Sequence, residues 1–136
     1  MSTPIAYPSA RAGREHFRDL LDAAERGVPA TVTRGAHTVA VLDADRLRHH
    51  LAVACPANAE VVPDAGGFSV LLPGRPIAAD GATFEEAIVE MVLALRDYAQ
   101  AWSARLRTAP NHEQHWELVQ LVMLSTDEQL AAWLTA

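Results

Sequence analysis

Arginine side chains recur near the N-terminal end of the chain at spacings that suit a helix. Arg11, Arg14 and Arg18 are three and four residues apart, so a helix would place them on one face. Guanidinium groups bind phosphates and can donate two hydrogen bonds to a guanine edge. Acidic residues also follow Arg11 and Arg18 four positions later, so the spacing alone favours an ordinary solvated face. Arg34 and His37 lie further along, where a basic side chain could contact a nucleic-acid backbone.

The histidines do not have the pattern of a metal site. His112 and His115 flank a glutamate, but they are three residues apart, whereas the zinc-protease pattern needs four so that both imidazoles share a helix face. No third ligand accompanies them, and the adjacent His49 and His50 would point to different faces of a helix. We therefore expect surface histidines and no bound metal.

No catalytic motif or cofactor site is visible in the sequence. The chain has no glycine-rich phosphate loop and no supported grouping of a serine, a histidine and an acid. Asp43 and Asp45, like Glu85 and Glu86, stand at expected helix starts, where the helix dipole favours acids. The sequence therefore predicts a binding protein without a cofactor, and not an enzyme.

Charge divides the 136 residues into two unlike parts. The net charge is −6, with +1 over residues 1–53 and −7 over residues 54–136. Half of the residues are hydrophobic, which indicates a globular protein, and the single cysteine, Cys55, excludes an internal disulfide. The first 20 residues contain no apolar leader, and no stretch is long enough to cross a bilayer. We expect a cytoplasmic protein that does not enter a membrane.

The N-terminal part predicts a strand, a helix, a hairpin and a second, short helix. In chain order these elements are Ile5 to Tyr7, a helix capped by Ser9 and ended by Gly27, Val28 to Arg34, Thr38 to Leu42, and a helix capped by Asp43. The expected hairpin loop is Gly35-Ala36-His37. One stripe of the first helix should be buried, namely Ala10, Phe17, Leu20, Leu21 and Ala24. We place the first domain at residues 1–53 and a linker at residues 54–59.

The C-terminal part, residues 60–136, predicts three short strands followed by three helices. The expected elements are Glu60 to Pro63, Phe68 to Leu72, Ile77 to Ala79, a long helix after Thr83, Glu113 to Leu124, and a last helix capped by Ser125. Thr83 and Glu86 have the spacing of a capping box. The long helix carries an apolar seam that we expect in the core, formed by Phe84, Ile88, Met91, Leu95, Tyr98 and Trp102.

Residues 5–51 resemble the N-terminal domain of the Phd/YefM antitoxin family. The resemblance rests on features in a shared order: Ser9-Ala10-Arg11 after a short strand, Phe17 and Leu20-Leu21, Gly27 and Pro29, Thr33-Arg34, then Ala40-Val41-Leu42. Pro8 and Gly13 depart from the family pattern, and they affect how the domain would dock on DNA more than the domain itself.

The resemblance implies an α/β dimer that presents paired basic surfaces to a palindromic operator. It implies that Arg11, at the start of the first helix, and Arg34, at the hairpin tip, contact DNA, and it favours Arg14 more weakly, while Arg18 stays structural. Physical chemistry agrees, because a helix N-terminus favours a phosphate and a nearby arginine can reach a guanine edge. The expected DNA-binding set is Ser9, Arg11, Arg14, Arg34 and His37.

Residues 59–100 are similar to a HicB-like antitoxin domain over three strands and one helix. The similarity rests on the runs Gly66-Gly67-Phe68-Ser69-Val70-Leu71-Leu72-Pro73 and Asp80-Gly81-Ala82-Thr83-Phe84-Glu85-Glu86-Ala87. That family binds a toxin, so the resemblance implies a partner-binding role for this half. Aromatic, leucine and methionine side chains anchor many interfaces, and internal packing is the equal alternative for those of the last helices. The expected toxin-binding set is Trp116, Met123, Leu130, Trp133 and Leu134.

Together these expectations describe an α+β protein: an N-terminal dimerisation domain, then a small sheet packed on a long helix, then two further helices. We expect an antitoxin of a type II toxin–antitoxin module that forms a homodimer or higher oligomer. It would bind a ribonuclease-type toxin directly and repress its own operon by binding operator DNA. The alternative is an oligomeric interaction module that has kept the fold but no longer binds DNA, which the near-neutral N-terminal part permits.

Overall fold

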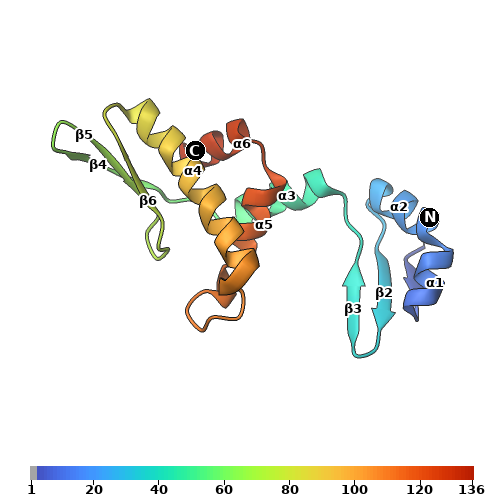
Figure 1. Cartoon of the computed structure of the whole chain (residues 1–136). Coiled ribbons are helices and arrows are strands. Elements are labelled where there is room, and N and C mark those ends of the chain that lie inside the picture. Colours follow the sequence, from blue (N-terminus) through green and yellow to red (C-terminus); the bar gives the residue numbers. More distant parts are fainter. Residues whose placement is uncertain (1–2) are drawn as a thin grey trace. The chain divides into compact units, whose positions relative to one another are not determined.

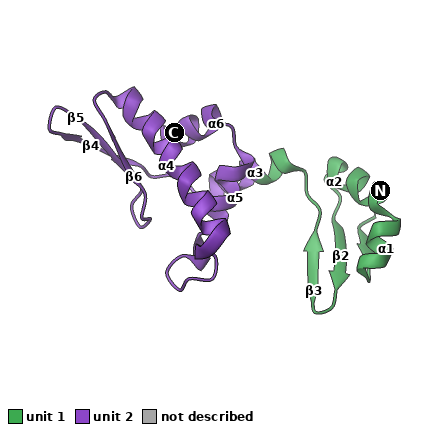
Figure 2. Cartoon of the chain, in the orientation of Figure 1, with its two compact units in different colours: residues 1–47 green, residues 48–136 purple. Residues whose placement is uncertain are grey.

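The structure is a computed structural model that describes residues 3–136. The chain folds into two compact units, Met1–Leu47 and Arg48–Ala136, called unit 1 and unit 2 below and coloured green and purple in Figure 2. The first predicted domain begins with residues 1 and 2, which lie outside the described range. The expected α+β class is confirmed, because each unit combines helices with a three-stranded sheet.

Unit 1 is a three-stranded sheet with two helices on one face. Its elements are β1 (Ile5–Tyr7), α1 (Ala10–Glu15), α2 (Phe17–Arg26), β2 (Ala30–Arg34), β3 (His37–Ala40) and the start of α3 (Ala44–Ala54). The strand order is β1-β2-β3, with β1 parallel and β3 antiparallel to β2. Parallel neighbours need a crossover connection, which α1 and α2 supply while packing against β1 and β2 (Figure 1). Leu20, Ala23 and Ala30 form the buried centre.

The prediction of one helix from Ser9 to Gly27 is wrong, because the backbone breaks at His16. Its φ of −118° and ψ of 30° end α1 and precede α2. Gly13 brings α1 very close to the sheet: a Cβ atom there would lie 2.9 Å from Cγ2 of Val32. The break therefore separates a short turn of helix in tight contact with β2 from the longer α2.

The buried stripe predicted for this segment is also partly wrong. Leu20 and Ala24 are buried, but Ala10, Phe17 and Leu21 are exposed. The cause is the width of the sheet, since the helices pack against β1 and β2 and leave the β3 edge uncovered. The apolar side chains that point toward this edge have nothing to cover them within unit 1.

The hairpin turn is one residue shorter than predicted. Only Gly35 and Ala36 separate the strands, and Gly35 has a φ of +61°, a conformation that glycine adopts without strain. His37 is therefore not a loop residue but the first residue of β3, where it pairs with Arg34. The predicted cap of the next helix is confirmed, because the Asp43 carboxylate accepts a hydrogen bond from a backbone N–H in its first turn.

Unit 2 is built around a long central helix. Its elements are β4 (Glu60–Asp64), β5 (Gly67–Leu71), β6 (Ala78–Gly81), α4 (Phe84–Ala101), a π-helical turn (Trp102–Leu106), a 3-10 turn (Glu113–His115), α5 (Trp116–Leu124) and α6 (Asp127–Leu134). The sheet order is β4-β5-β6, and both pairs are antiparallel. One side of α4 packs on β5 and β6, and α5 and α6 also pack on α4 (Figure 1). The apolar seam predicted for α4 lies in this core through Ile88, Met91 and Leu95, but its first predicted member, Phe84, is exposed.

The two helix caps predicted for unit 2 have different outcomes. Thr83 caps α4 as expected, since its hydroxyl accepts a hydrogen bond from Glu86 N at 3.1 Å. The cap of α6 is Thr126, which forms a reciprocal capping box with Gln129, and not Ser125. Ser125 is buried, and its hydroxyl donates to the Leu121 carbonyl oxygen at 2.6 Å, so it ends α5.

Candidate functional site

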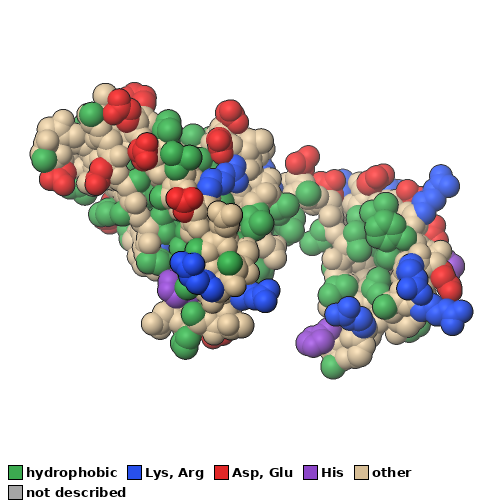
Figure 3. All heavy atoms as spheres, viewed as in Figure 1, with side chains coloured by type: hydrophobic (Ala, Val, Ile, Leu, Met, Phe, Trp, Pro, Cys, Tyr) green, Lys and Arg blue, Asp and Glu red, His purple; other side chains and the backbone are tan. Residues whose placement is uncertain are grey.

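Unit 1 carries an open groove between its helices and the uncovered β3 edge. Its floor is apolar, and its two large apolar side chains that are exposed to solvent are Phe17 from α2, 56% exposed, and Val39 from β3, 58% exposed. Arg14, Arg34 and His37 also line the groove. Figure 3 shows basic side chains beside this green apolar surface. Within the described part of the chain, no acidic residue lines the groove, so its edge is positively charged.

Strand register explains why these basic residues share one groove. Side chains alternate between the faces of a strand, so Val32 and Arg34 point to the same face of β2. Val32 contacts α1 at Gly13, which makes this the helix-covered face. His37 is paired with Arg34 and faces the same way at the end of the hairpin. The sheet thus brings Arg34 and His37 to the side on which α1 presents Arg14.

The remaining two predicted DNA-binding residues lie at the start of α1. Ser9 is the N-cap, and its Oγ accepts a hydrogen bond from Ala12 N at 3.1 Å. The exposed Arg11 pairs with Glu15 at 3.1 Å, an i,i+4 surface pair of the kind that contributes little to stability. Arg11 does not line the groove. Three of the five predicted residues are therefore together in the groove, and two stand at the helix start.

The five predicted toxin-binding residues divide into buried and exposed side chains. Leu130, Trp133 and Leu134 are buried in unit 2, on the face of α6 that packs into its core. Trp116 and Met123 are exposed, and they lie seven residues apart on α5, which places them on one side of that helix. Only these two of the five are open to a partner in this fold.

The histidines near residue 112 form a polar cluster with a tyrosine. The Tyr98 hydroxyl lies 2.9 Å from Nδ1 of His112 and 2.7 Å from Nδ1 of His115. Trp102 donates from its indole nitrogen to the His112 carbonyl oxygen at 2.8 Å. Burial lowers the pKa of His115, helped by the nearby His112 and Arg75, and burial raises the pKa of Tyr98. The cluster joins the end of α4 to the segment that precedes α5.

Residues 3–136 have neither the side-chain grouping of a metal site nor a helix suited to a membrane. No group of three or more histidine, cysteine, aspartate or glutamate side chains is arranged to hold a metal ion in that range. In the same range, every helix is too short or too polar to span a bilayer.

The fold of this chain matches that of a solved crystal structure. The crystal structure of the antitoxin part of a candidate toxin/antitoxin system from Syntrophomonas wolfei subsp. wolfei matches with a TM-score of 0.78 and 22% sequence identity. The match covers 98% of this chain and 96% of that one, so both units share the fold of the relative. A comparison with curated proteins gives no match.

The sequence itself carries the family assignment. A PHD-like family model, described as "Antitoxin of toxin-antitoxin, RelE / RelB, TA system", matches residues 6–134. Because the match spans both units, the chain belongs to this family of antitoxins.

Proposed function

We propose that the protein is the antitoxin of a type II module, which neutralises a ribonuclease-type toxin by direct binding and represses its own operon by binding operator DNA. Family membership supports the antitoxin role and a cognate toxin partner. The observation that carries the DNA-binding part is the groove of unit 1, where Arg14, Arg34 and His37 border an exposed apolar surface. The cytoplasm, where the operon lies, is the proposed location.

A homodimer formed through unit 1 would account for both the exposed apolar floor of this groove and the basic residues at its edge. Phe17 and Val39 are large apolar side chains left partly open to water, and burial of their exposed area against a second copy would contribute about 1–1.5 kcal/mol each. A two-fold axis through this surface would repeat Arg14 and Arg34 on both copies. Paired guanidinium groups of this kind suit a palindromic duplex, in which each half-site meets one copy.

The two finer family resemblances are part of this proposal. Unit 1 has the strand, helix, hairpin and helix order expected of a Phd/YefM-type domain. Unit 2 has three antiparallel strands followed by the capped α4, the arrangement expected of a HicB-like domain. Direct toxin contact is proposed through unit 2, where Trp116 and Met123 on α5 are the exposed members of the predicted set.

DNA binding is tested by a mobility shift with the fragment upstream of the operon. Arg34→Ala and Arg14→Ala should weaken the shift strongly, because each removes a guanidinium that lines the groove in both copies. Arg11→Ala tests the helix start separately. Arg18→Ala is the matched control, since Arg18 is exposed on α2 and does not line the groove. Binding that survives both groove substitutions would contradict a DNA-reading role for this surface.

Dimerisation has its own test, the mass in solution by size-exclusion chromatography with light scattering. Val39→Glu should yield monomers, because it places a charge where the apolar surface would be buried. Ala40→Glu is the control, since Ala40 is exposed on the opposite face of β3. A wild-type protein that dimerises but never shifts DNA would favour the alternative, an interaction module without DNA binding, which the net charge of +1 over residues 1–53 permits.

A further inference from the structure

Unit 2 has a second exposed surface that none of the predicted residues occupies. A hollow lies between α4 and α6, lined by Val89, Val92 and Leu93 from α4 and by Asp127, Glu128 and Ala131 from α6. A neighbouring hollow between β6 and the first turns of α4 shares Val89 and is otherwise bordered by Asp80, Glu85, Glu86 and Glu90. Because Val89 belongs to both, the hollows form one continuous surface, called the α4–α6 face below.

The centre of the α4–α6 face is apolar. Val89 is 59% exposed and Leu93 is 51% exposed, and they stand one turn apart on α4. The opposite stripe of the same helix, with Met91 and Leu95, is fully buried against the core. The helix is therefore apolar on two sides, although burial within unit 2 explains only one of them. Val89 and Leu93 therefore form a small apolar patch on α4 that no other part of unit 2 covers.

The rim of the α4–α6 face is acidic. Within the described residues, none of the side chains lining the two hollows is basic, and Glu85, Glu90 and Glu128 form no ion pair. Figure 3 shows red side chains around green ones on the surface over α4 and α6, with a blue side chain beside them, and Arg96 pairs with Asp127 at this end of the face. Like charges around an apolar centre repel one another until a partner of opposite charge arrives.

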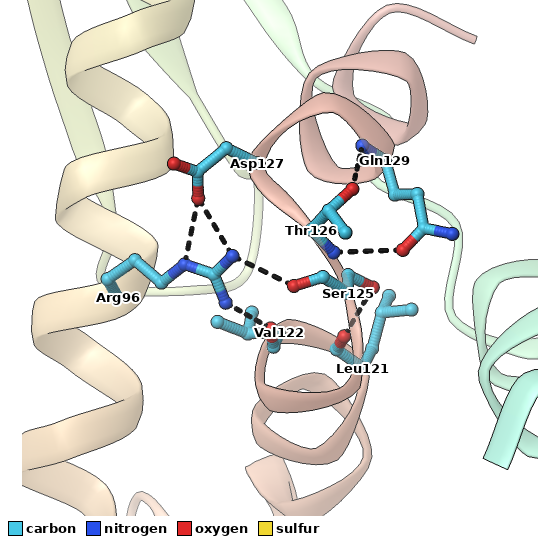
Figure 4. A network of polar contacts seen from close by, with 7 residues as sticks. All are labelled: Arg96, Leu121, Val122, Ser125, Thr126, Asp127 and Gln129. Carbon is cyan, nitrogen blue, oxygen red and sulfur yellow. Dashed lines mark hydrogen bonds and ion pairs between the residues drawn. The ribbon is translucent and has the colours of Figure 1, made fainter.

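The face is held in shape before any partner binds. Arg96 reaches from α4 to the end of α5, where its guanidinium donates to the carbonyl oxygens of Val122 and Ser125 and to the Asp127 carboxylate (Figure 4). The capping box of Thr126 and Gln129 fixes the first turn of α6 beside it. A surface that is already ordered loses less conformational entropy when a partner docks.

We propose that the α4–α6 face is where the cognate toxin docks, through an apolar side chain flanked by lysine or arginine residues. This inference rests on the antitoxin function proposed above. Charge complementarity selects the occupant: the carboxylates that line the face, of which Glu85, Glu90 and Glu128 form no ion pair, match a basic protein surface, and a nucleic acid would be repelled. A second copy of the same face would be repelled as well, because two-fold pairing would bring these carboxylates together.

The test uses the full-length chain and the protein encoded by the neighbouring gene, purified separately and titrated by calorimetry. Leu93→Arg should weaken binding about tenfold or more. It replaces the apolar centre of the face with a positive charge, which would repel the lysine or arginine residues of the toxin. Val62→Arg is the control for this change, since Val62 is an exposed valine on the sheet face opposite the buried Val70. Both sites are exposed, and thermal unfolding of each variant verifies that the fold is kept.

A second pair of variants tests the acidic rim. Glu90→Lys should weaken binding and make the remaining affinity less sensitive to salt between about 50 and 300 mM. Glu60→Lys makes the same charge change on exposed β4, away from the face, and should bind as the wild type does. Trp116→Ala tests the alternative surface on α5.

The outcomes separate this inference from the proposed function. Normal binding by Leu93→Arg and Glu90→Lys would overturn the docking site, and loss of binding by Trp116→Ala in that case would place the toxin on α5. A lower mass in solution for Leu93→Arg alone, without the partner, would also overturn it, because the face would then join copies of this chain. If the wild-type chain does not bind the neighbouring gene product at all, the proposed neutralisation by direct toxin binding fails.

Discussion

The indole Nε1 of Trp133 donates a hydrogen bond to the carbonyl oxygen of Cys55 at 3.0 Å. The bond joins α6, near the end of the chain, to the segment that follows α3, 78 residues earlier. Trp133 is only 8% exposed, and Leu130 beside it is fully buried. The last helix is therefore part of the core of unit 2 and closes it against the start of that unit.

Loss of this tryptophan should destabilise unit 2 strongly. Trp133→Ala is expected to lower the free energy of unfolding by about 3–5 kcal/mol, because it removes a large buried side chain and leaves a cavity. Trp133→Phe keeps most of the volume but leaves the Cys55 carbonyl without its donor, which costs about 1–3 kcal/mol. Urea unfolding followed by circular dichroism measures both. Equal stability of all three proteins would show that α6 does not close the core.

The burial of Trp133 could not be predicted from its neighbours in the sequence. A helix with Leu130, Trp133 and Leu134 on one side is equally suited to a core and to an interface, because the pattern records amphipathicity and not what lies opposite. The choice depends on a contact with Cys55, a residue assigned to a linker from its turn-prone surroundings. The opposite mismatch occurs at Phe17 and Leu21. Their helical spacing predicts burial, but they are exposed because the sheet is too narrow to cover them.

Gly13 should resist replacement even by alanine. In a helix this change normally stabilises a protein by about 0.5–1 kcal/mol. Here the new Cβ would lie 2.9 Å and 3.0 Å from the two γ carbons of Val32, and a β-branched side chain has little freedom to move away. Gly13→Ala should therefore lower the stability of unit 1 by about 1–3 kcal/mol.

A double-mutant cycle tests this contact directly. If the steric contact is the cause, Gly13→Ala should cost much less in a Val32→Ala background than in the wild type. Thermal unfolding of the four proteins gives the coupling free energy. Additive effects would mean that Gly13 is needed for some reason other than its closeness to Val32.

Helix caps and turns could be predicted from the sequence, because they depend on residues that are close together along the chain. The Thr83 cap and the three strands of unit 2 follow from capping and turn residues, and the structure has them close to the expected positions. The α6 cap was misplaced by one residue, because Ser125 and Thr126 both carry a hydroxyl with a Glu or Gln three positions later. Only the burial of Ser125 against Leu121 separates the two.

The candidate DNA-binding groove could be predicted only in part from the sequence, because strand pairing and not local sequence brings its residues together. Arg14 and Arg34 were chosen from the sequence, but their shared groove depends on the pairing register of the hairpin, which places His37 opposite Arg34. The α4–α6 face was missed altogether. Val89 and Leu93 lie outside the apolar seam, and single exposed aliphatic residues are common on helices.

Arg96 should matter more for stability than its ion pair suggests. The Arg96–Asp127 pair is largely open to solvent on the Asp127 side, so Asp127→Asn should cost less than about 1 kcal/mol. Arg96→Ala also removes the donors to the carbonyl oxygens of Val122 and Ser125, and should cost about 1–3 kcal/mol. Chemical unfolding of both variants measures the difference. Similar losses for the two would assign the effect to the ion pair alone.

The cluster around Tyr98 predicts that unit 2 loses stability in mild acid. Burial lowers the pKa of His115 below its ordinary value of 6.5, and the positive charge of Arg75 and the ring of His112 act in the same direction. Between the lowered pKa and 6.5, the unfolded chain binds more protons at this site than the folded chain does. Above pH 6.5, His115 therefore makes its full contribution to the free energy of unfolding. This contribution is lost as the pH falls from 6.5 through the pKa of His115 in the folded state.

Urea midpoints measured from about pH 7.5 down to about pH 5.5 test this prediction. The wild type should show a falling midpoint over this range, and His115→Gln should show a shallower fall, because glutamine can bond to the Tyr98 hydroxyl but does not titrate. His37→Gln is the control, since His37 is exposed on unit 1. Parallel curves for the wild type and His115→Gln would mean that carboxylates elsewhere account for the acid sensitivity, and that the lowered pKa of His115 has no measurable linkage to folding.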